Sequence, residues 1–250
     1  MNVDGFGLGW YGHSRQLETY HSEKPAWADR NLPSICERVR SGSFFAHVRA
    51  ATDTEVTQAN CHPFANGRLL FMHNGQVGGW PAIRQCVEAA LPSRVKLLQR
   101  GTTDSEAIFL SAIADGLESD AISSIKRTLA RLLALRSAVF ALGPLRFAAV
   151  LSDGDTLWAF RWSCDARPPT LFYRQRRGGV TVASEPIDQG YPDWDEVPSG
   201  TCLIARRGEP IRIVPFVVPR PSDIYVRHAR ERKIAGIRSI HKSKRAIASC

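Results

Sequence analysis

The chain has 250 residues, 44% hydrophobic and 23% charged, which suits one large globular domain or two small ones and excludes a low-complexity chain. No run approaches the roughly 18 apolar residues of a membrane span, and the start MNVDGFGLGWYG lacks the pattern of a secretory signal. The net charge of +9 is concentrated in residues 218–250, which hold nine basic and two acidic residues, so the nearly neutral body argues against nucleic acid as a partner.

The six cysteines are scattered along the chain and contain no CxxC pair. They are Cys36, Cys61, Cys86, Cys164, Cys202 and Cys250. In a chain of this length, such spacing favours reduced thiols over a disulfide framework, and it does not fit a zinc ribbon. We therefore expect a cytoplasmic protein.

Three glycines lie two residues apart in residues 5–11, GFGLGWY. Strand geometry puts them on one face, where another backbone or a substrate can come close. The polar and aromatic stretch 12–32 is predicted to be a loop, and residues 35–40 a short helix that Gly42 ends. Strands are predicted at 44–48 and 69–73.

Helices are predicted next, at residues 81–91, 104–117 and 121–135, and Thr102-Thr103 are the predicted caps of the second of these. After Gly143-Pro144 the chain changes to short strand-like runs with turn signals between them, and Ser152-Asp153-Gly154-Asp155 is a hairpin signal. These runs are 147–151, 156–162, 170–173, 180–184, 201–206 and 211–217. Strands, then helices, then strands without βαβ alternation predict an α+β fold of antiparallel sheets covered by helices.

The segment 44–75, FFAHVRAATDTEVTQANCHPFANGRLLFMHNG, contains the strongest chemical signal. It predicts two strands that bring Arg49 and Asn74-Gly75 to a common edge. An arginine can hold a carboxylate by a two-pronged pair. An asparagine amide and a glycine N–H can stabilise a developing oxyanion. The segment therefore predicts a pocket for a small amino acid.

Several short motifs resemble the class II glutamine amidotransferases, which are N-terminal-nucleophile hydrolases. They are DGFGLGWY (4–11), FFAHVRAAT (44–52), NCHPF (60–64), FMHNG (71–75), GTTDSEAIF (101–109) and VASEP (182–186). Their order and spacing also fit. The most similar branch is the stand-alone type that resembles γ-glutamyl hydrolases of thiol metabolism.

This resemblance implies a four-layer αββα sandwich over residues 1–217, followed by a basic tail at 218–250. It implies a small-molecule substrate, glutamine or a γ-glutamyl amide, and no cofactor. Arg49 would hold the substrate α-carboxylate, Asp104 its α-ammonium, and Asn74 and Gly75 would form the oxyanion hole. His73 and His62 would shape the pocket rather than carry out chemistry.

The resemblance also implies a nucleophile that this chain lacks. In the family, an N-terminal cysteine attacks the side-chain amide, and its own α-amino group takes the thiol proton, which its pKa near 8 allows. This chain begins with Met1-Asn2 instead. We therefore expect a truncated or misannotated start, with the first strand missing, and no glutaminase activity for these 250 residues. The alternative is a non-catalytic module that binds glutamine or a γ-glutamyl compound.

Other interpretations of the same residues remain open. Arg49 could form a surface ion pair, Asn74-Gly75 could be a type I′ turn, and Asp104 could simply favour a helix N-terminus. A metal site could form from His47, Cys61, His62 and His73, but adjacent Cys-His pairs rarely ligate together and no carboxylate completes the set, so none is predicted. The basic tail could be an amphipathic helix or a solvated end. The oligomeric state is not determined by the sequence.

Overall fold

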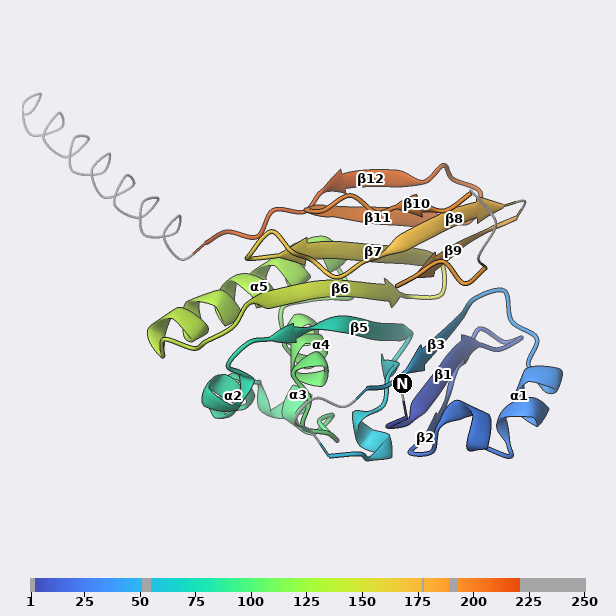
Figure 1. Cartoon of the computed structure of the whole chain (residues 1–250), viewed down its shortest axis with the longest axis horizontal. Coiled ribbons are helices and arrows are strands. Elements are labelled where there is room, and N and C mark those ends of the chain that lie inside the picture. Colours follow the sequence, from blue (N-terminus) through green and yellow to red (C-terminus); the bar gives the residue numbers. More distant parts are fainter. Residues whose placement is uncertain (1–2, 51–54, 177, 189–192, 221–250) are drawn as a thin grey trace, which may run out of the picture.

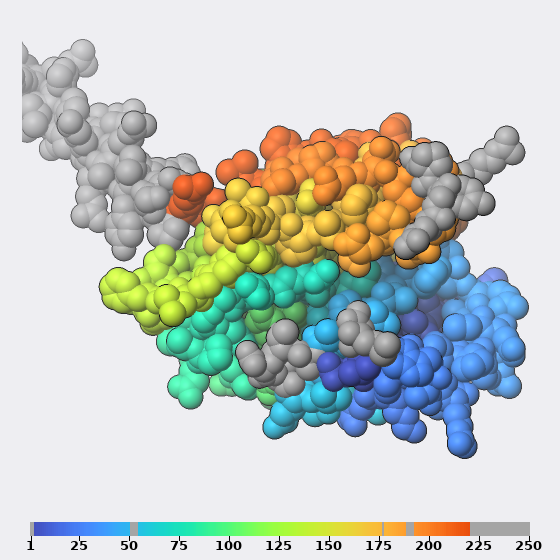
Figure 2. Space-filling model, viewed as in Figure 1, coloured from blue at the N-terminus to red at the C-terminus, as the bar shows by residue number. Residues whose placement is uncertain are grey.

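The fold is described from a computed structural model, which covers residues 3–50, 55–176, 178–188 and 193–220. Most of the predicted basic tail, residues 221–250, therefore lies outside the described residues. The described residues contain no helix that is long and apolar enough to cross a membrane. Figure 1 shows the strands stacked in layers, and Figure 2 shows the first strands and α1, in blue, packed beneath the last strands, in orange.

The largest sheet has six antiparallel strands in the order β12-β11-β7-β6-β5-β4. Their bounds are β4 (Phe64–Asn66), β5 (Leu69–Val77), β6 (Leu145–Ser152), β7 (Thr156–Ser163), β11 (Thr201–Arg206) and β12 (Arg212–Pro215). The predicted turn at residues 152–155 joins β6 to β7 as a hairpin. Strand β5 is longer than β4, so its C-terminal half has a partner on the β6 side alone.

Two three-stranded antiparallel sheets lie over one face of the large sheet (Figure 1). One has the order β2-β1-β3, with β1 (Phe6–Tyr11), β2 (Leu17–Ser22) and β3 (Phe44–Val48). The other has the order β10-β8-β9, with β8 (Phe172–Arg176), β9 (Gly179–Ala183) and β10 (Asp195–Glu196). Strands β3 and β9 each form the edge of their own sheet.

Helices cover the opposite face of the six-stranded sheet (Figure 1). These helices are α2 (Trp80–Ala89), α3 (Ser93–Lys96), α4 (Asp104–Ala114) and α5 (Ala121–Ala138). Helix α1 (Leu32–Arg38) lies instead on the side of the β2-β1-β3 sheet (Figure 1), and 3-10 turns occur at Ala26–Ala28 and Gln58–Asn60. The main core lies between this sheet and α2, α4 and α5, and Phe71 stacks on Phe109 there at 5.3 Å between ring centroids. The predicted α+β sandwich is confirmed. The expectation of a missing first strand stays a prediction.

Two local predictions are wrong. Residues 12–32 were expected to be a loop, but they contain β2. It is an edge strand whose sequence, LETYHS, shows no clear apolar alternation. The strand expected at 69–73 continues to Val77, so Asn74-Gly75 lies inside a strand and does not form a turn. Asn74 and Gly75 pair with Ala148 and Phe147 of β6, and this long-range pairing overrides the local turn preference.

The bare face predicted for β1 is confirmed. A Cβ atom on Gly7 would lie 2.1 Å from the His62 carbonyl oxygen, and one on Gly9 would lie 2.7 Å from Leu70 Cδ1. The glycines therefore let the segment around His62 and strand β5 come close to β1. This close approach brings the motifs at 5–11 and 60–64 together.

Candidate active site

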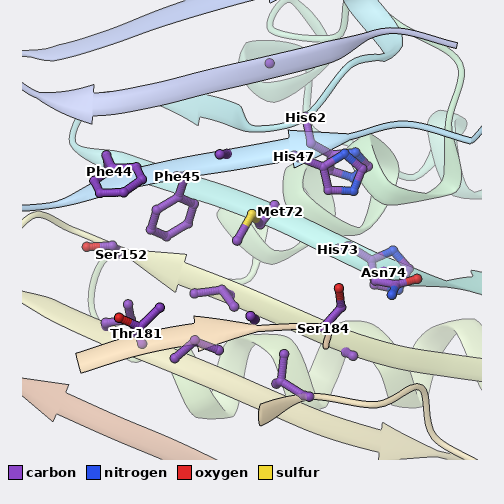
Figure 3. Close-up of a pocket in the computed structure, with 18 of the residues that line it drawn as sticks. Phe44, Phe45, His47, His62, Met72, His73, Asn74, Ser152, Thr181 and Ser184 are labelled. Carbon is purple, nitrogen blue, oxygen red and sulfur yellow. The ribbon is translucent and has the colours of Figure 1, made fainter. Parts of the chain in front are cut away.

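A cavity of about 1570 Å³ lies between the six-stranded sheet and the two smaller sheets. Its walls include all of β3, all of β9 and residues 72–77 of β5. Figure 3 shows His47, His62, His73, Asn74 and Ser184 gathered at one end, with Phe44, Ser152 and Thr181 toward the other. Phe45 and Met72 lie between these two groups. The cavity is therefore polar at its ends and apolar in the middle.

Arg49 lies just after β3 and lines the cavity although its side chain is 4% exposed. Its Nη2 donates to the Glu55 carbonyl oxygen at 3.0 Å, and its Nη1 donates to the Asp4 carbonyl oxygen at 3.4 Å. These carbonyl acceptors orient the guanidinium. The alternative of an exposed ion pair on the surface does not fit the burial of Arg49.

Asn74 and Gly75 line the same cavity from β5. A Cβ atom on Gly75 would lie 2.0 Å from the Arg146 carbonyl oxygen and 2.5 Å from His73 Nε2, so no other residue fits there without movement. The Val77 N–H points away from β6, because it donates to Asp104 Oδ2 at 2.8 Å. Backbone N–H groups two residues apart point to the same side of a strand, so the Gly75 N–H shares this side with that of Val77.

Asp104 is the first residue of α4 and lines the cavity. Thr103 caps this helix, since its Oγ1 accepts from the Glu106 N–H at 3.1 Å. The carboxylate of Asp104 suits the positive end of the helix dipole, as expected from sequence. Its bond to Val77 also fixes it beside β5. The helix-terminus interpretation and the binding-site interpretation of Asp104 are thus compatible.

His73 of β5 connects the start of α4 to strand β6. Its Nδ1 lies 2.9 Å from Ser105 Oγ, and its Nε2 lies 3.3 Å from the Arg146 carbonyl oxygen. Burial lowers the pKa of His73, although the Asp104 carboxylate opposes the shift. Because a carbonyl oxygen can only accept, neutral His73 donates from Nε2 and accepts the Ser105 hydroxyl at Nδ1.

His47 and His62 pack against each other with ring centroids 4.3 Å apart. Burial, with smaller effects from His73 and Arg49, lowers the pKa of His47 to about 4. Burial also holds the pKa of His62 well below its usual value, with a further effect from His47. Both rings are therefore neutral near pH 7. Neither His47 Nδ1 nor either ring nitrogen of His62 has a hydrogen-bond partner among the described residues.

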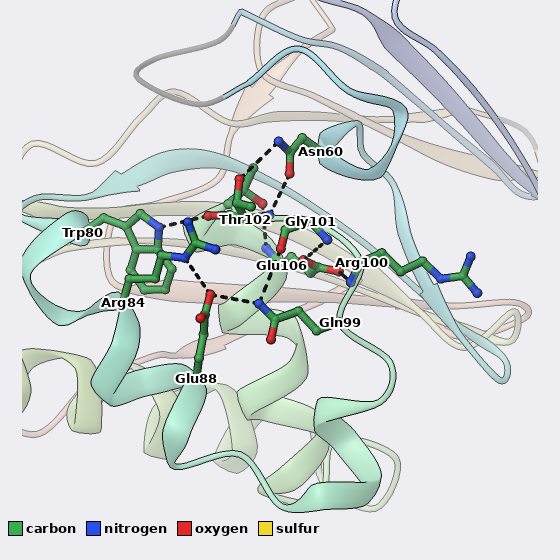
Figure 4. Close-up of polar contacts among 10 residues, drawn as sticks. Asn60, Trp80, Arg84, Glu88, Gln99, Arg100, Gly101, Thr102 and Glu106 are labelled. Carbon is green, nitrogen blue, oxygen red and sulfur yellow. Dashed lines mark hydrogen bonds and ion pairs between the residues drawn. The ribbon is translucent and has the colours of Figure 1, made fainter.

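A second hydrogen-bond network supports the α4 N-terminus from behind (Figure 4). Glu106 accepts from the backbone N–H groups of Arg100 and Gly101, both at 2.8 Å. Asn60 accepts from the Thr102 N–H at 2.8 Å and donates to the Glu55 carbonyl oxygen at 2.9 Å. Asn60 thus links the NCHPF motif to the GTTDSEAIF motif and to the carbonyl group that holds Arg49.

No described cysteine lines the cavity. Cys61 is buried behind β1 and β2, with its Sγ 3.6 Å from the Ser22 carbonyl oxygen, and burial raises the pKa of its thiol. This position fits a packed cysteine, as its sequence context predicts. Within the described ranges, no three His, Cys, Asp or Glu side chains gather in a way that could hold a metal ion, and this includes the alternative set of His47, Cys61, His62 and His73.

The comparison with known families agrees with this geometry. The family model described as "Glutamine amidotransferases class-II" matches residues 1–178, more than half of the chain. The chain belongs to the class II glutamine amidotransferases. Within these limits lie the motifs that supply Arg49, Asn74-Gly75 and Asp104. The family resemblance predicted from sequence is confirmed.

Individual family members show different degrees of similarity. The probable glutamine amidotransferase DUG3 of Saccharomyces cerevisiae is 35% identical over 114 residues, which cover 44% of this chain and 32% of DUG3. The match thus spans about a third of the yeast protein. The γ-glutamyl-hercynylcysteine sulfoxide hydrolase of Mycolicibacterium smegmatis is 28% identical over 203 residues, 79% of this chain and 75% of that protein.

A solved structure extends the similarity to three dimensions. The glutamine aminotransferase class-II domain protein SPO2029 from Silicibacter pomeroyi superposes with a TM-score of 0.77 and 38% identity. The aligned part covers 85% of this chain and 92% of that one. The fold predicted from the resemblance therefore agrees with that of a solved family member.

The structure brings every residue that the sequence singled out as binding or catalytic into one cavity. Arg49, His73, Asn74, Gly75 and Asp104 all line it. Sequence reasoning missed the supporting residues Ser105, Asn60 and Glu106 as parts of the site. Their place in the sequence could have indicated them, since each lies inside one of the family motifs.

Proposed function

We propose that the cavity binds glutamine or a γ-glutamyl compound by its amino-acid end. Arg49 binds the α-carboxylate and Asp104 the α-ammonium, while Asn74 and Gly75 face the γ-carbonyl oxygen. The main support for this proposal is the 2.8 Å hydrogen bond that the Val77 N–H donates to Asp104 Oδ2. It ties the anionic group to the strand that bears Gly75, so the proposed amine and carbonyl sites belong to one rigid unit.

The charges of Arg49 and Asp104 suit an α-amino acid, in which a carboxylate and an ammonium group are attached to the same carbon. The guanidinium of Arg49 is buried and oriented by the carbonyl groups of Asp4 and Glu55. A charge-assisted, two-pronged contact with a carboxylate is among the stronger hydrogen-bonded pairs in proteins. His73 then acts as a positioning residue, because it accepts from Ser105 beside Asp104.

The oxyanion site needs donors that are fixed before the reaction. The Gly75 N–H shares one side of β5 with the Val77 N–H, and pairing to β6 holds that strand in place. Preorganised donors of this kind stabilise the charge that develops on a carbonyl oxygen during acyl transfer. The structure therefore supports Asn74 and Gly75 as the donors for a tetrahedral intermediate.

In the reaction that we propose, a thiolate adds to the γ-carbonyl carbon and ammonia or an amine leaves with a proton. Water then cleaves the thioester and releases glutamate. The thiolate would come from an N-terminal cysteine whose α-amino group takes the thiol proton. None of the described cysteines lines the cavity. We therefore propose that these 250 residues bind the substrate and do not hydrolyse it, which is also the behaviour of a binding module.

Calorimetric titration with glutamine tests the recognition proposal. We expect binding by the unmodified chain and a loss of at least about tenfold in affinity for both Arg49→Lys and Asp104→Asn, because each change removes one charge-assisted contact. Arg212→Gln, on β12 outside the cavity, is the control. Near-UV circular dichroism checks that each variant is folded. Unchanged affinity in Arg49→Lys would contradict the proposal.

An ammonia-release assay tests the catalytic part separately. We expect no turnover of glutamine by these 250 residues. Turnover that disappears in Arg49→Lys would mean that our assignment of the nucleophile is wrong.

Two broader expectations also belong to the proposal. Residues 1–217 act as one domain and 218–250 as a separate basic tail, which limited proteolysis can test. A cytoplasmic location is supported by the five described cysteines, all of which are free.

A further inference from the structure

The cavity extends well beyond the proposed glutamine site. It follows the whole of β3, Phe44–Val48, whose four steps span about 13 Å, and it extends to Gly42 before the strand and to Arg49 after it. Its volume of about 1570 Å³ exceeds the roughly 300–1,000 Å³ of pockets that hold drug-sized ligands. Glutamine bound at Arg49 therefore leaves most of the cavity unfilled.

The middle of the cavity is apolar. Phe45 and Met72 lie between the two polar ends in Figure 3. The cavity is also lined by Val150 of β6, by Leu171 just before β8, and by Val182 of β9, which belong to the same apolar cluster as Phe45 and Met72. Burial of an uncharged, elongated part of a ligand in this stretch would be favourable, because it removes apolar surface from water.

The end far from Arg49 carries a cation. Arg207 lines the cavity from the turn between β11 and β12, and its Nη2 lies 3.0 Å from where a Cβ of Gly42 would be. The nearby acidic groups are already paired. Asp155 binds Arg15 and Arg68 at 3.0 and 2.9 Å, and Glu209 binds Arg206 at 3.3 Å. Among the described residues, no carboxylate pairs with Arg207.

We propose that this cavity takes a γ-glutamyl amide whose amine part is a long apolar chain that ends in a carboxylate at Arg207. The inference rests on the proposed function, because it assumes that the glutamyl group occupies the Arg49 end. It deepens that function by naming the substrate class. A second anion at Arg207 would complement the one free cation that the described residues place at that end.

Synthetic conjugates test this class directly. The probes are glutamate linked through its γ-carboxyl group to glycine, aminohexanoic acid or aminoundecanoic acid, each also made with a terminal carboxamide. In calorimetric titrations, we expect affinity to rise at least about tenfold from the glycine to the aminoundecanoic conjugate, since burial of each methylene is favourable. We expect the long acid to bind about threefold to fivefold more tightly than its carboxamide, as an exposed ion pair allows.

The variant Arg207→Gln separates charge recognition from chain length. It is expected to abolish the preference for the acid over the carboxamide and to keep the dependence on length. Arg212→Gln, a matched exposed arginine outside the cavity, is expected to keep both. Arg49→Lys should weaken every conjugate, which excludes non-specific binding of the long chain.

Each outcome decides between the two proposals. If glutamine binds in an Arg49-dependent way but affinity does not rise with length, or if Arg207→Gln keeps the acid preference, this inference is wrong and the proposed function stands. If neither glutamine nor any conjugate binds, both are wrong.

Discussion

The two faces of the six-stranded sheet are built from different side chains. Along β6, Phe147 faces the helices and is 0% exposed, whereas its neighbours Ala148 and Val150 face the smaller sheets. Phe71 and Phe160 repeat the large residue on the helix face. Large side chains thus fill the space under α4 and α5, and smaller ones leave room for the cavity. One sheet therefore supplies stability on one face and a binding site on the other.

The largest difference between the two faces is expected when neighbouring residues on opposite faces of β5 are truncated. Phe71→Ala is expected to lower the free energy of unfolding by about 3–5 kcal/mol, because it removes a buried ring that stacks on Phe109. Met72→Ala, which faces the cavity, is expected to cost only about 1–2 kcal/mol, since Met72 is only half-buried. Denaturant unfolding measures both. Equal losses would contradict the difference between the faces.

Acid is expected to lower the free energy of unfolding, because the cavity face of the sheet packs against buried histidines such as His47. The pKa of folded His47 is about 4, below its usual 6.5, so the unfolded chain binds more protons between these values. Stability is therefore expected to fall as the pH drops from about 6.5 to about 4, by about 2–3 kcal/mol from this residue, without further loss from it below that range.

Unfolding curves at several pH values measure this loss. His47→Gln is expected to flatten the dependence on pH between about 4 and 6.5, because the group that binds the extra proton is gone. His13→Gln, an exposed substitution of the same kind, is the control. A slope that is unchanged in His47→Gln would show that the histidine is not the source.

The link between the helices and the cavity should depend on Glu106. Glu106→Gln is expected to cost about 1–3 kcal/mol, because a carboxamide cannot accept from both the Arg100 and Gly101 N–H groups. Since the same loop leads into Asp104, glutamine affinity should fall as well. Glu118→Gln, on the exposed surface, is the control for both thermal unfolding and titration. Full stability of Glu106→Gln would show that the hydrogen bonds of Glu106 do not stabilise the fold.

The smallest effect is expected at the cap of α4. Thr103→Ala should cost about 1 kcal/mol, since it removes the bond from the Glu106 N–H. The same cap at the start of α5 provides a comparison, because Asp120 accepts from the Ser123 N–H at 3.0 Å. Asp120→Ala should lose similar stability and leave glutamine affinity unchanged. A loss of glutamine affinity in Asp120→Ala would mean that affinity depends on the overall stability of the fold and not on the cap of α4.

Sequence predicted the elements with strong periodicity and the residues within recognisable motifs. The strand at 44–48, the cap at Thr103 and the hairpin at 152–155 follow from local patterns, and the structure has each of them. Strand β2 could not be predicted, because an edge strand needs no clear apolar alternation. The continuation of β5 through Asn74-Gly75 also escaped prediction, since it depends on pairing with a strand about seventy residues later.

Short motifs with fixed order and spacing were enough to identify the family, the fold class and the candidate residues Arg49, Asn74-Gly75 and Asp104. The spatial relation between those residues became visible only in the folded chain. The bond from Val77 to Asp104 joins a strand to a helix, and the burial of His47 against His62 comes from two separate segments. The length of the cavity along β3 is likewise a property of packed sheets. Such contacts depend on distances between remote parts of the chain, which local patterns do not encode.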